Sequence, residues 1–200
     1  MGTDKATLEF SGHTLIARAI AILSEAGLPV LISGNRPDLE NLAPTVDDLG
    51  SSQGPLGGIC GALQVTSVTT AVFLPVDMPL LPSALIRVMQ KIAQVTGHAV
   101  VVPSVNGFVQ TFPAVLNRAV LPLLTAELEA GRGGCFFAFN AAARALGQQV
   151  HVVRTELLVQ SGQLQHPDGV PAARWFLNIN SATDLRRAQA FRSGKAGAAG

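Results

Sequence analysis

The chain has 200 residues, of which 48% are hydrophobic and 14% are charged, and its formal net charge is +1. That length suits one globular domain, and this hydrophobic content excludes a disordered chain. The near-neutral charge excludes a broad basic surface, so we expect no binding to nucleic acid. No apolar run approaches the roughly 20 residues of a membrane helix, and the N-terminus lacks the form of a secretion signal. The two cysteines, Cys60 and Cys135, have no zinc-type spacing. We therefore expect a cytoplasmic protein that does not associate with membranes.

The first half of the chain alternates amphipathic and continuously apolar segments. Apolar residues at helical spacing predict a helix over residues 14–26, and an apolar run predicts a buried strand over 29–32. Residues 35–53 are polar and rich in turn-forming residues, and a loop of that length is often functional. A helix is predicted over 54–67, and an apolar strand over 69–75.

The second half continues this alternation. We expect helices over 82–94, 117–130, 135–146 and 181–191, strands over 99–103, 150–153 and 175–179, an edge or bent strand over 108–116 after the Asn106-Gly107 turn, and a loop over 160–173. Helices that alternate with apolar strands predict one α/β domain over residues 1–193 with a mainly parallel sheet, and a disordered tail over 194–200. Ligands bind such sheets beyond the carboxyl ends of the strands.

Asp77 lies at one of these strand ends. It follows an apolar strand, and Pro79 then directs the chain away from the sheet. A carboxylate at that place is suited to hold a hard cation such as Mg²⁺. The local pattern is equally compatible with an aspartate that caps the helix beginning near Pro82.

The other polar and glycine-rich segments are less specific. The GPLGG stretch from Gly54 to Gly58 could bring a helix N-terminus close to a phosphate, or it could form a plain turn. It matches neither a dinucleotide-binding fingerprint nor a P-loop. The Asn178-Ile179-Asn180 sequence could be turn chemistry before a helix. The four histidines are each expected to be ordinary surface or core residues: His13, His98, His151 and His166.

Several motifs in order resemble the molybdenum cofactor guanylyltransferase family: MGTDKATLEFSGHTL, ISGNR, DD, GPLGGI, PVDMPLL and LNINSATDL. The resemblance runs from residue 1 to about residue 190. It implies a Rossmann-like three-layer nucleotidyltransferase fold. It also implies an enzyme that transfers GMP from GTP to a molybdopterin-type molybdenum cofactor, forms the guanine dinucleotide cofactor and releases pyrophosphate, with Mg²⁺ as its own cofactor. The implied partners are GTP and molybdopterin, and molybdoenzymes are the implied recipients of the product. The expected oligomeric state is a monomer or weak oligomer.

The resemblance also assigns roles to individual residues. Lys5 and Asp77 are implied to be catalytic, and Asp77 to bind the metal. Asn180 is implied to lie near the pterin phosphate or the metal. Ser33 stands where the family often has asparagine, and Asp48 is the alternative to Asp47 with a one-residue slip. The implied nucleotide contacts are Lys5, Ser33, Asn35, Asp47, Gly54, Pro55, Leu56, Gly57 and Asp77.

One feature of the family has no counterpart in this sequence. Family members begin with a strand and a glycine-rich loop of the type LAGGxSxRMG, and this sequence starts at the MG of that motif. We therefore expect the first strand of the sheet to be missing. Either the true start lies roughly 15 residues upstream, or the chain is a truncated form with little activity. The alternatives to guanylyl transfer are an inactive paralogue that binds the cofactor or a partner, and another nucleotidyltransferase (cytidylyl or sugar-nucleotidyl).

Overall fold

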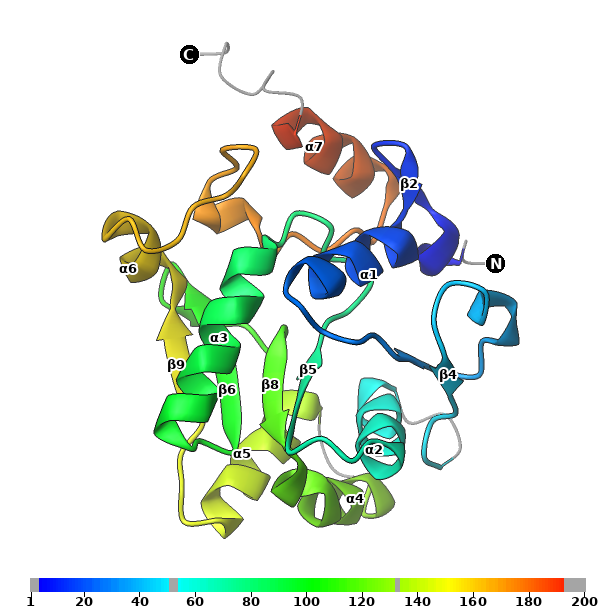
Figure 1. The fold of residues 1–200 in the computed structure, drawn as a ribbon, viewed down its shortest axis with the longest axis vertical. Helices are drawn as coiled ribbons and strands as arrows, with labels where there is room; N and C mark the ends of the chain where they lie inside the picture. Colours follow the sequence, from blue (N-terminus) through cyan, green and yellow to red (C-terminus); the bar gives the residue numbers. More distant parts are fainter. Residues whose placement is uncertain (1–3, 51–53, 132–133, 193–200) are drawn as a thin grey trace.

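A five-stranded mixed sheet runs through the centre of the molecule (Figure 1). The computed structural model describes residues 4–50, 54–131 and 134–192, so the tail expected over 194–200 lies outside the described residues. The strands of this sheet are β5 (Thr70–Phe73), β6 (Val100–Val105), β7 (Phe108–Val109), β8 (Ala114–Asn117) and β9 (His151–Arg154).

The prediction of a mainly parallel sheet is wrong. Within this sheet β9 is parallel to β6, whereas β8 pairs antiparallel with both β5 and β6. The cause is the Asn106-Gly107 turn, in which both residues have positive φ (52° and 79°). Such a two-residue turn reverses the chain into a hairpin, so β7 and then β8 run opposite to β6. Residues 114–117 thus lie inside the sheet, between β5 and β6, and not at its edge.

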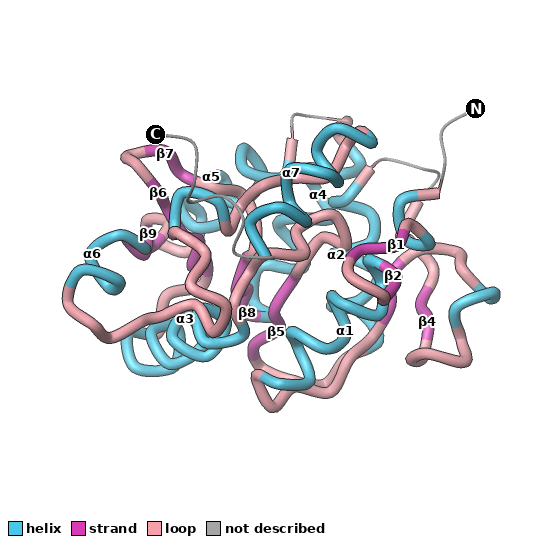
Figure 2. The backbone as a smooth tube through the Cα atoms, turned by 90° about the horizontal axis from the view of Figure 1, so that it is seen from above, coloured by secondary structure: helices cyan, strands magenta, loops and turns pink. Residues whose placement is uncertain are grey.

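Helices cover both faces of the sheet, which gives three layers (Figure 2). On one face lie α1 (Leu15–Glu25) and α3 (Ser83–Thr96), and on the other lie α2 (Pro55–Val65), α4 (Leu121–Glu129) and α5 (Cys135–Ala145). The side chains of β6 alternate between the two cores: Val101 and Val105 pack on the α3 side, Val100 and Val102 on the α4 side. Burial on both faces explains why this strand is apolar except for Ser104.

A second, smaller structure lies beside the sheet. Here β3 (Ile32–Ser33) pairs in parallel with β4 (Thr45–Val46), near the short 3-10 helices η1 (Lys5–Thr7) and η2 (Pro37–Leu39). A hairpin of β1 (Glu9–Phe10) and β2 (His13–Thr14) connects η1 to α1. We call residues 4–7 and 32–46 the N-terminal wall. The wall packs on α1 in a small core of four buried residues, of which Ile16 comes from α1: Ala6, Ile16, Ile32 and Leu39.

The C-terminal part departs most from the predicted elements. Beyond β9 the chain forms α6 (Thr155–Gln160), η4 (Ala172–Arg174) and α7 (Ala182–Arg192), and α6 was not predicted. The strand predicted over 175–179 is wrong, because this segment is irregular. Its apolar side chains Trp175, Phe176 and Ile179 are buried in the core without a ladder of backbone bonds. Among the described residues no helix is long and apolar enough to cross a membrane.

Candidate functional site

Asp77 lies in the loop that leaves the carboxyl end of β5, as predicted. Its side chain is 18% exposed, and its backbone oxygen accepts a hydrogen bond from the Ile179 N–H at 2.9 Å. The alternative prediction, an aspartate that caps the next helix, is wrong because α3 has Pro82 at its N-cap position. The carboxylate is therefore held at the edge of the sheet where ligands bind α/β proteins.

Lys5 and Asn180 meet Asp77 at this edge. The Lys5 Nζ lies 3.1 Å from Asp77 Oδ2, and it also donates a hydrogen bond to Asn180 Oδ1. These contacts join residues 72 and 175 positions apart in the chain. The Lys5 side chain is 43% exposed, and such partly exposed ion pairs contribute at most about 1 kcal/mol to stability. This ion pair therefore adds little to the stability of the fold.

Local structure positions both partners of Asp77. Asp4 caps η1 by accepting a hydrogen bond from the Ala6 N–H at 3.1 Å, which fixes the turn that carries Lys5. Asn180 directly precedes the predicted cap Ser181, whose Oγ accepts from the Asp184 N–H at 3.2 Å. The Ser181 hydroxyl in turn donates to the Asp184 carboxylate and holds the pKa of Asp184 below its usual value. Two short capped turns thus present Lys5 and Asn180.

The glycines of α2 allow the loop of residues 47–49 to lie against this helix. A Cβ on Gly61 would lie 2.3 Å from the Asp47 carbonyl oxygen, and one on Gly57 would lie 3.0 Å from the Leu49 carbonyl oxygen. A Cβ on Gly58 would lie 2.7 Å from Ser33 Oγ and 3.0 Å from Asp48 Oδ1. These glycines therefore permit a close approach of the backbone.

The same packing places Asp48, and not its neighbour, beside Ser33. The carboxylate of Asp48 and the hydroxyl of Ser33 both face Gly58, as the two distances above show. Burial, followed by the nearby charge of Asp47, raises the pKa of Asp48. Asp47 is exposed, and its backbone carbonyl is the group that contacts α2.

The remaining residues that the resemblance implied lie around the entrance to α2 and β3. Gly54 is the N-cap residue of α2 at φ 71°, a conformation that favours glycine, and Pro55 opens the helix. The Leu56 side chain is buried in the core, so this residue could contact a nucleotide only through its backbone. Asn35 is exposed just beyond β3. Its neighbour Arg36 binds the carboxylates of Asp38 and Asp4, each at 2.7 Å.

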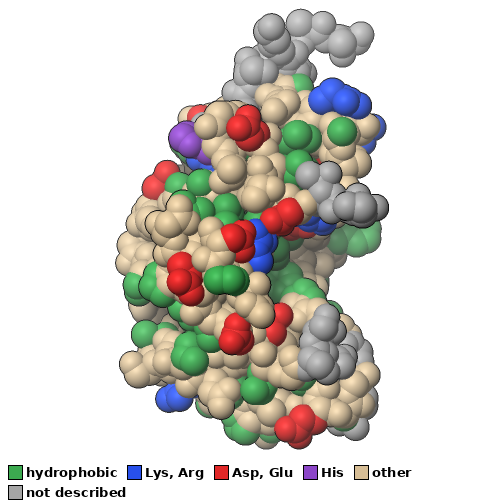
Figure 3. All heavy atoms as spheres, turned by 90° about the vertical axis from the view of Figure 1, so that its right-hand side faces the viewer, with side chains coloured by type: hydrophobic (Ala, Val, Ile, Leu, Met, Phe, Trp, Pro, Cys, Tyr) green, Lys and Arg blue, Asp and Glu red, His purple; other side chains and the backbone are tan. Residues whose placement is uncertain are grey.

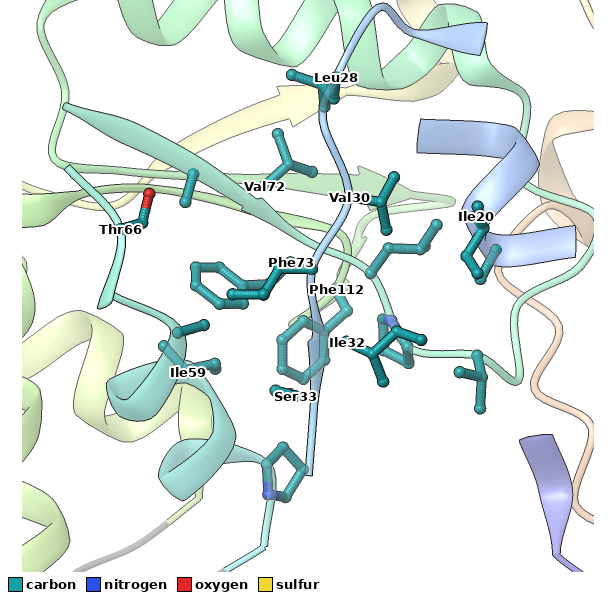
Figure 4. A pocket seen from close by; sticks show the side chains of 18 of the residues that line it. Ile20, Leu28, Val30, Ile32, Ser33, Ile59, Thr66, Val72, Phe73 and Phe112 are labelled. Carbon is teal, nitrogen blue, oxygen red and sulfur yellow. The ribbon is translucent and has the colours of Figure 1, made fainter. Parts of the chain in front are cut away.

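A groove separates β3 from β5 and reaches the polar side chains of Ser33 and Asp77 (Figure 4). It has a volume of about 470 Å³ and is lined mainly by apolar side chains of residues 28–32, of β5 and of the facing sides of α1 and α2. Ser33, Pro55 and Asp77 also line it. Figure 3 shows this side of the molecule hollowed, with hydrophobic side chains inside the hollow and charged side chains at its rim.

The structure thus brings Lys5, Asp77 and Asn180 together, and Ser33 lies near α2 with Asp48. Sequence reasoning included Gly58 in the GPLGG stretch but missed Gly61, although glycines at 54, 57, 58 and 61 recur at helical spacing and indicate a face of close approach. Two of the histidines, each predicted to be an ordinary surface or core residue, lie close together. The rings of His98 and His151 lie 4.7 Å apart near the first residues of β6 and β9, at the other end of the sheet.

The sequence of the chain is similar to those of known proteins. A sequence profile of the MobA-like NTP transferase domain matches residues 1–153. The chain is 43% identical to a molybdenum cofactor guanylyltransferase of Xanthomonas euvesicatoria pv. vesicatoria over 88 residues, which is 43% of this chain and 44% of that protein. It is 30% identical to a probable molybdenum cofactor guanylyltransferase of Chloroflexus aggregans, over 95% of this chain and 88% of that protein.

The fold is also similar to that of a solved structure. The molybdopterin-guanine dinucleotide biosynthesis protein A of Archaeoglobus fulgidus superposes with a TM-score of 0.73 at 19% identity. The match covers 96% of this chain and 92% of that one. At this identity the likeness shows the fold alone, and that fold is an α/β nucleotidyltransferase fold.

Proposed function

The chain belongs to the MobA-like NTP transferase family, and from that premise we propose that it transfers GMP from GTP to a molybdopterin-type molybdenum cofactor. In this reaction an oxygen of the terminal phosphate of the pterin forms a bond to the α-phosphorus of GTP. The bond from the α-phosphorus to the bridging oxygen breaks, and pyrophosphate leaves with the electron pair. The observation that carries the proposal is the assembly of Lys5, Asp77 and Asn180 at the edge of the groove.

The residues of the site have roles that follow from their positions. The Lys5 ammonium, which is partly exposed, can move from Asp77 onto the phosphate oxygens of GTP and neutralise their charge. The N-terminal turn of α2, entered through Gly54 and Pro55, presents backbone N–H groups that favour a phosphate. Ser33 and Asn35, beside that turn, can bind the nucleotide by hydrogen bonds, and so can the loop acid at Asp47 or Asp48.

The donor set at Asp77 fits a magnesium ion. Asp77 Oδ2 and Asn180 Oδ1 already converge on one positive charge, the Lys5 ammonium, and both are oxygen donors that Mg²⁺ prefers. The described part of the chain holds no group of three or more His, Cys, Asp or Glu residues suited to a metal. Mg²⁺ is commonly held by one or two protein oxygens together with substrate phosphates and water. When bound, the ion supplies positive charge to the phosphoryl oxygens.

The test is pyrophosphate release from GTP, Mg²⁺ and molybdopterin cofactor by the wild type and by Asp77→Asn. Loss of several kcal/mol of electrostatic stabilisation predicts that kcat falls about 100-fold or more. Glu25→Gln is the matched control, because Glu25 is an exposed carboxylate at the end of α1. Equal rates for the wild type and Asp77→Asn would contradict the assigned role.

The two alternative functions are separated by further arms of the same experiment. A panel of GTP, CTP and other nucleoside triphosphates separates guanylyl transfer from cytidylyl or sugar-nucleotidyl transfer. Calorimetry with molybdopterin cofactor and with GTP tests the non-catalytic alternative. Tight binding of the pterin with no binding of GTP and no turnover would favour a binding protein and refute the proposed reaction.

We also propose that the groove is the position of the first strand that the resemblance implies. β5 pairs only with β8 and β3 only with β4 among the described residues, so each has an edge open to another strand. In Figure 4 residues 28–33 cross beside β5 without pairing to it. Apolar side chains on both sides of the groove suit a strand of about five residues that is apolar on both faces.

This position can be tested by attaching an apolar five-residue strand ahead of Met1 through a flexible linker. Hydrogen exchange should slow at the amides of β5 that face the groove, because a paired strand protects them. The matched control carries the same segment with two prolines, which cannot donate to a ladder. Equal protection in both proteins would refute the assignment.

The proposal includes a cytoplasmic protein that acts as a monomer or weak oligomer on GTP and molybdopterin, with molybdoenzymes as the recipients of the product. Both cysteines are free thiols. Burial raises the pKa of Cys135 to about 11, so its thiol is protonated at neutral pH. Size-exclusion chromatography with light scattering measures the oligomeric state.

A further inference from the structure

The loop of residues 77–81 has three of its backbone carbonyls bound by groups from distant segments. The Ile179 N–H donates to the Asp77 oxygen at 2.9 Å, and Arg18 Nε donates to the Pro79 oxygen at 3.2 Å. His166 Nε2 lies 3.0 Å from the Leu80 oxygen. The loop that carries the reactive carboxylate is therefore fixed by hydrogen bonds on its backbone as well as by the burial of its side chains.

The contacts of His166 determine which ring nitrogen carries the proton. The Asp168 N–H donates to Nδ1 at 3.0 Å, so Nδ1 acts as an acceptor. In the neutral ring Nε2 then carries the proton and donates it to the Leu80 oxygen. The ring is buried, at 9% exposure, and packs against Trp175 with 5.9 Å between the ring centroids. This histidine is held in one orientation toward the loop.

One segment of the chain supplies both this histidine and a member of the site. Residues 164–180 contribute His166 at one end, and Ile179 and Asn180 at the other. Only Met78 and Pro79 separate Asp77 from Leu80, whose carbonyl oxygen His166 contacts. This segment thus contacts the loop at Leu80 and at Asp77, and it also supplies Asn180 to the site.

We propose that His166 is a positioning residue: through the Leu80 carbonyl it holds Asp77 in the direction that meets Lys5 and Asn180. This inference rests on the proposed function for its kinetic consequence, but its structural consequence is independent of it. His166 contacts the loop at the Leu80 carbonyl, three residues along the chain from Asp77. A displacement of Asp77 by about 1 Å would lower kcat strongly while leaving the binding of GTP nearly unchanged.

The test compares His166→Leu, which keeps the bulk and lacks the donor, with His166→Gln, whose side-chain amide can donate to Leu80. We expect Mn²⁺, used alone as the probe, to bind about ten-fold more weakly to His166→Leu, and kcat to fall about 10- to 100-fold with KM for GTP within about two-fold. His166→Gln should restore most of both. His13→Gln is the control, because His13 is an exposed histidine in β2.

A third readout is hydrogen exchange at the Ile179 amide, which donates to the Asp77 oxygen. Exchange should be faster in His166→Leu and return toward wild type in His166→Gln. Unchanged exchange in a folded His166→Leu protein overturns the proposal, whether or not any variant transfers GMP. If His166→Leu fails to fold, His166→Asn replaces it, since its shorter amide cannot reach Leu80, and the same comparison with His166→Gln decides. If the variants show this exchange pattern but the wild type transfers no GMP, the proposed function alone is refuted.

Discussion

The N-terminal wall and the five-stranded sheet form two sides of the same groove, but they are held together very differently. The wall has a core of four residues and two strands of two residues each. The sheet has strands of up to six residues between two large cores. Because stability varies with the number of buried contacts, the wall should open at a lower cost than the sheet.

The site draws on both regions. Asp77 lies in the loop that follows β5 of the sheet, whereas Lys5, Ser33 and Asn35 belong to the wall. The contact of Lys5 with Asp77 joins them across the groove. The Lys5 side chain is 43% exposed and that of Asp77 is 18% exposed, so the lysine has the greater freedom to follow phosphates in the proposed reaction.

The largest difference is expected from matched truncations in the two cores. Ile86→Ala removes a fully buried side chain beneath the sheet and should lower the free energy of unfolding by about 2–5 kcal/mol. Ile32→Ala, in the four-residue core of the wall, should cost less because this small cluster can collapse around the cavity. Urea unfolding measures both values. Equal losses in the free energy of unfolding would show that the core of the wall resists collapse around a cavity as well as the core beneath the sheet.

Gly61→Ala tests the contact between α2 and the loop that follows the wall. The added Cβ would lie 2.3 Å from the Asp47 carbonyl oxygen, so the loop must move, and overpacking of this kind costs about 1–3 kcal/mol. Gly134→Ala is the matched control, because a Cβ there meets no described atom within 4 Å. The measurement is the unfolding midpoint in urea. A Gly61→Ala protein as stable as the control would contradict the close approach.

Asp48→Asn should stabilise the protein at neutral pH. Burial raises the pKa of Asp48 above 3.8, so the folded state holds this proton more tightly than the unfolded state. Wild-type stability contributed by this group is therefore lost as pH rises from about 3.8 through the folded pKa. Asp48→Asn lacks this loss, so the two proteins should differ at pH 7 and converge in acid. Parallel stability curves from about pH 3.5 to about pH 7 would contradict the raised pKa.

Asp38→Asn should show the opposite sign and the smallest effect. The Arg36 guanidinium lowers the pKa of Asp38, so its contribution to stability is present above pH 3.8 and is lost as pH falls through the folded pKa. The pair lies on the surface of the wall and is screened by salt. Thermal melts at low salt and at about 1 M NaCl measure the effect. A loss of stability that persists at high salt would show a buried contact instead.

The elements that were predicted well from sequence are those in which the spacing of apolar residues follows the face that the element buries. The helices near α1, α2, α3 and α5 were predicted, because each buries an apolar stripe or face. The strand predicted over 175–179 was wrong because that prediction also rested on apolar residues alone. Trp175, Phe176 and Ile179 are buried, but periodicity reports burial and not the presence of a pairing partner.

The candidate site was predictable only in part. The apolar strand before Asp77 marked this carboxylate, and the resemblance pointed to Lys5 and Asn180. Asp48, and not Asp47, lies beside Ser33, because the packing of residues 47–49 on α2 decides which side chain faces inward. His166 carried no local signal, since its partner is a backbone carbonyl 86 positions away.

The sequence by itself determined the fold class, the near-neutral charge and which residues have chemistry to offer. Only the tertiary structure decided that the sheet is mixed and that β8 lies inside it. It also decided that Lys5 contacts both Asp77 and Asn180. The reason is physical. Periodicity, caps and turns arise from residues a few positions apart, whereas the groove and its charges depend on contacts between segments that only the folded chain brings together.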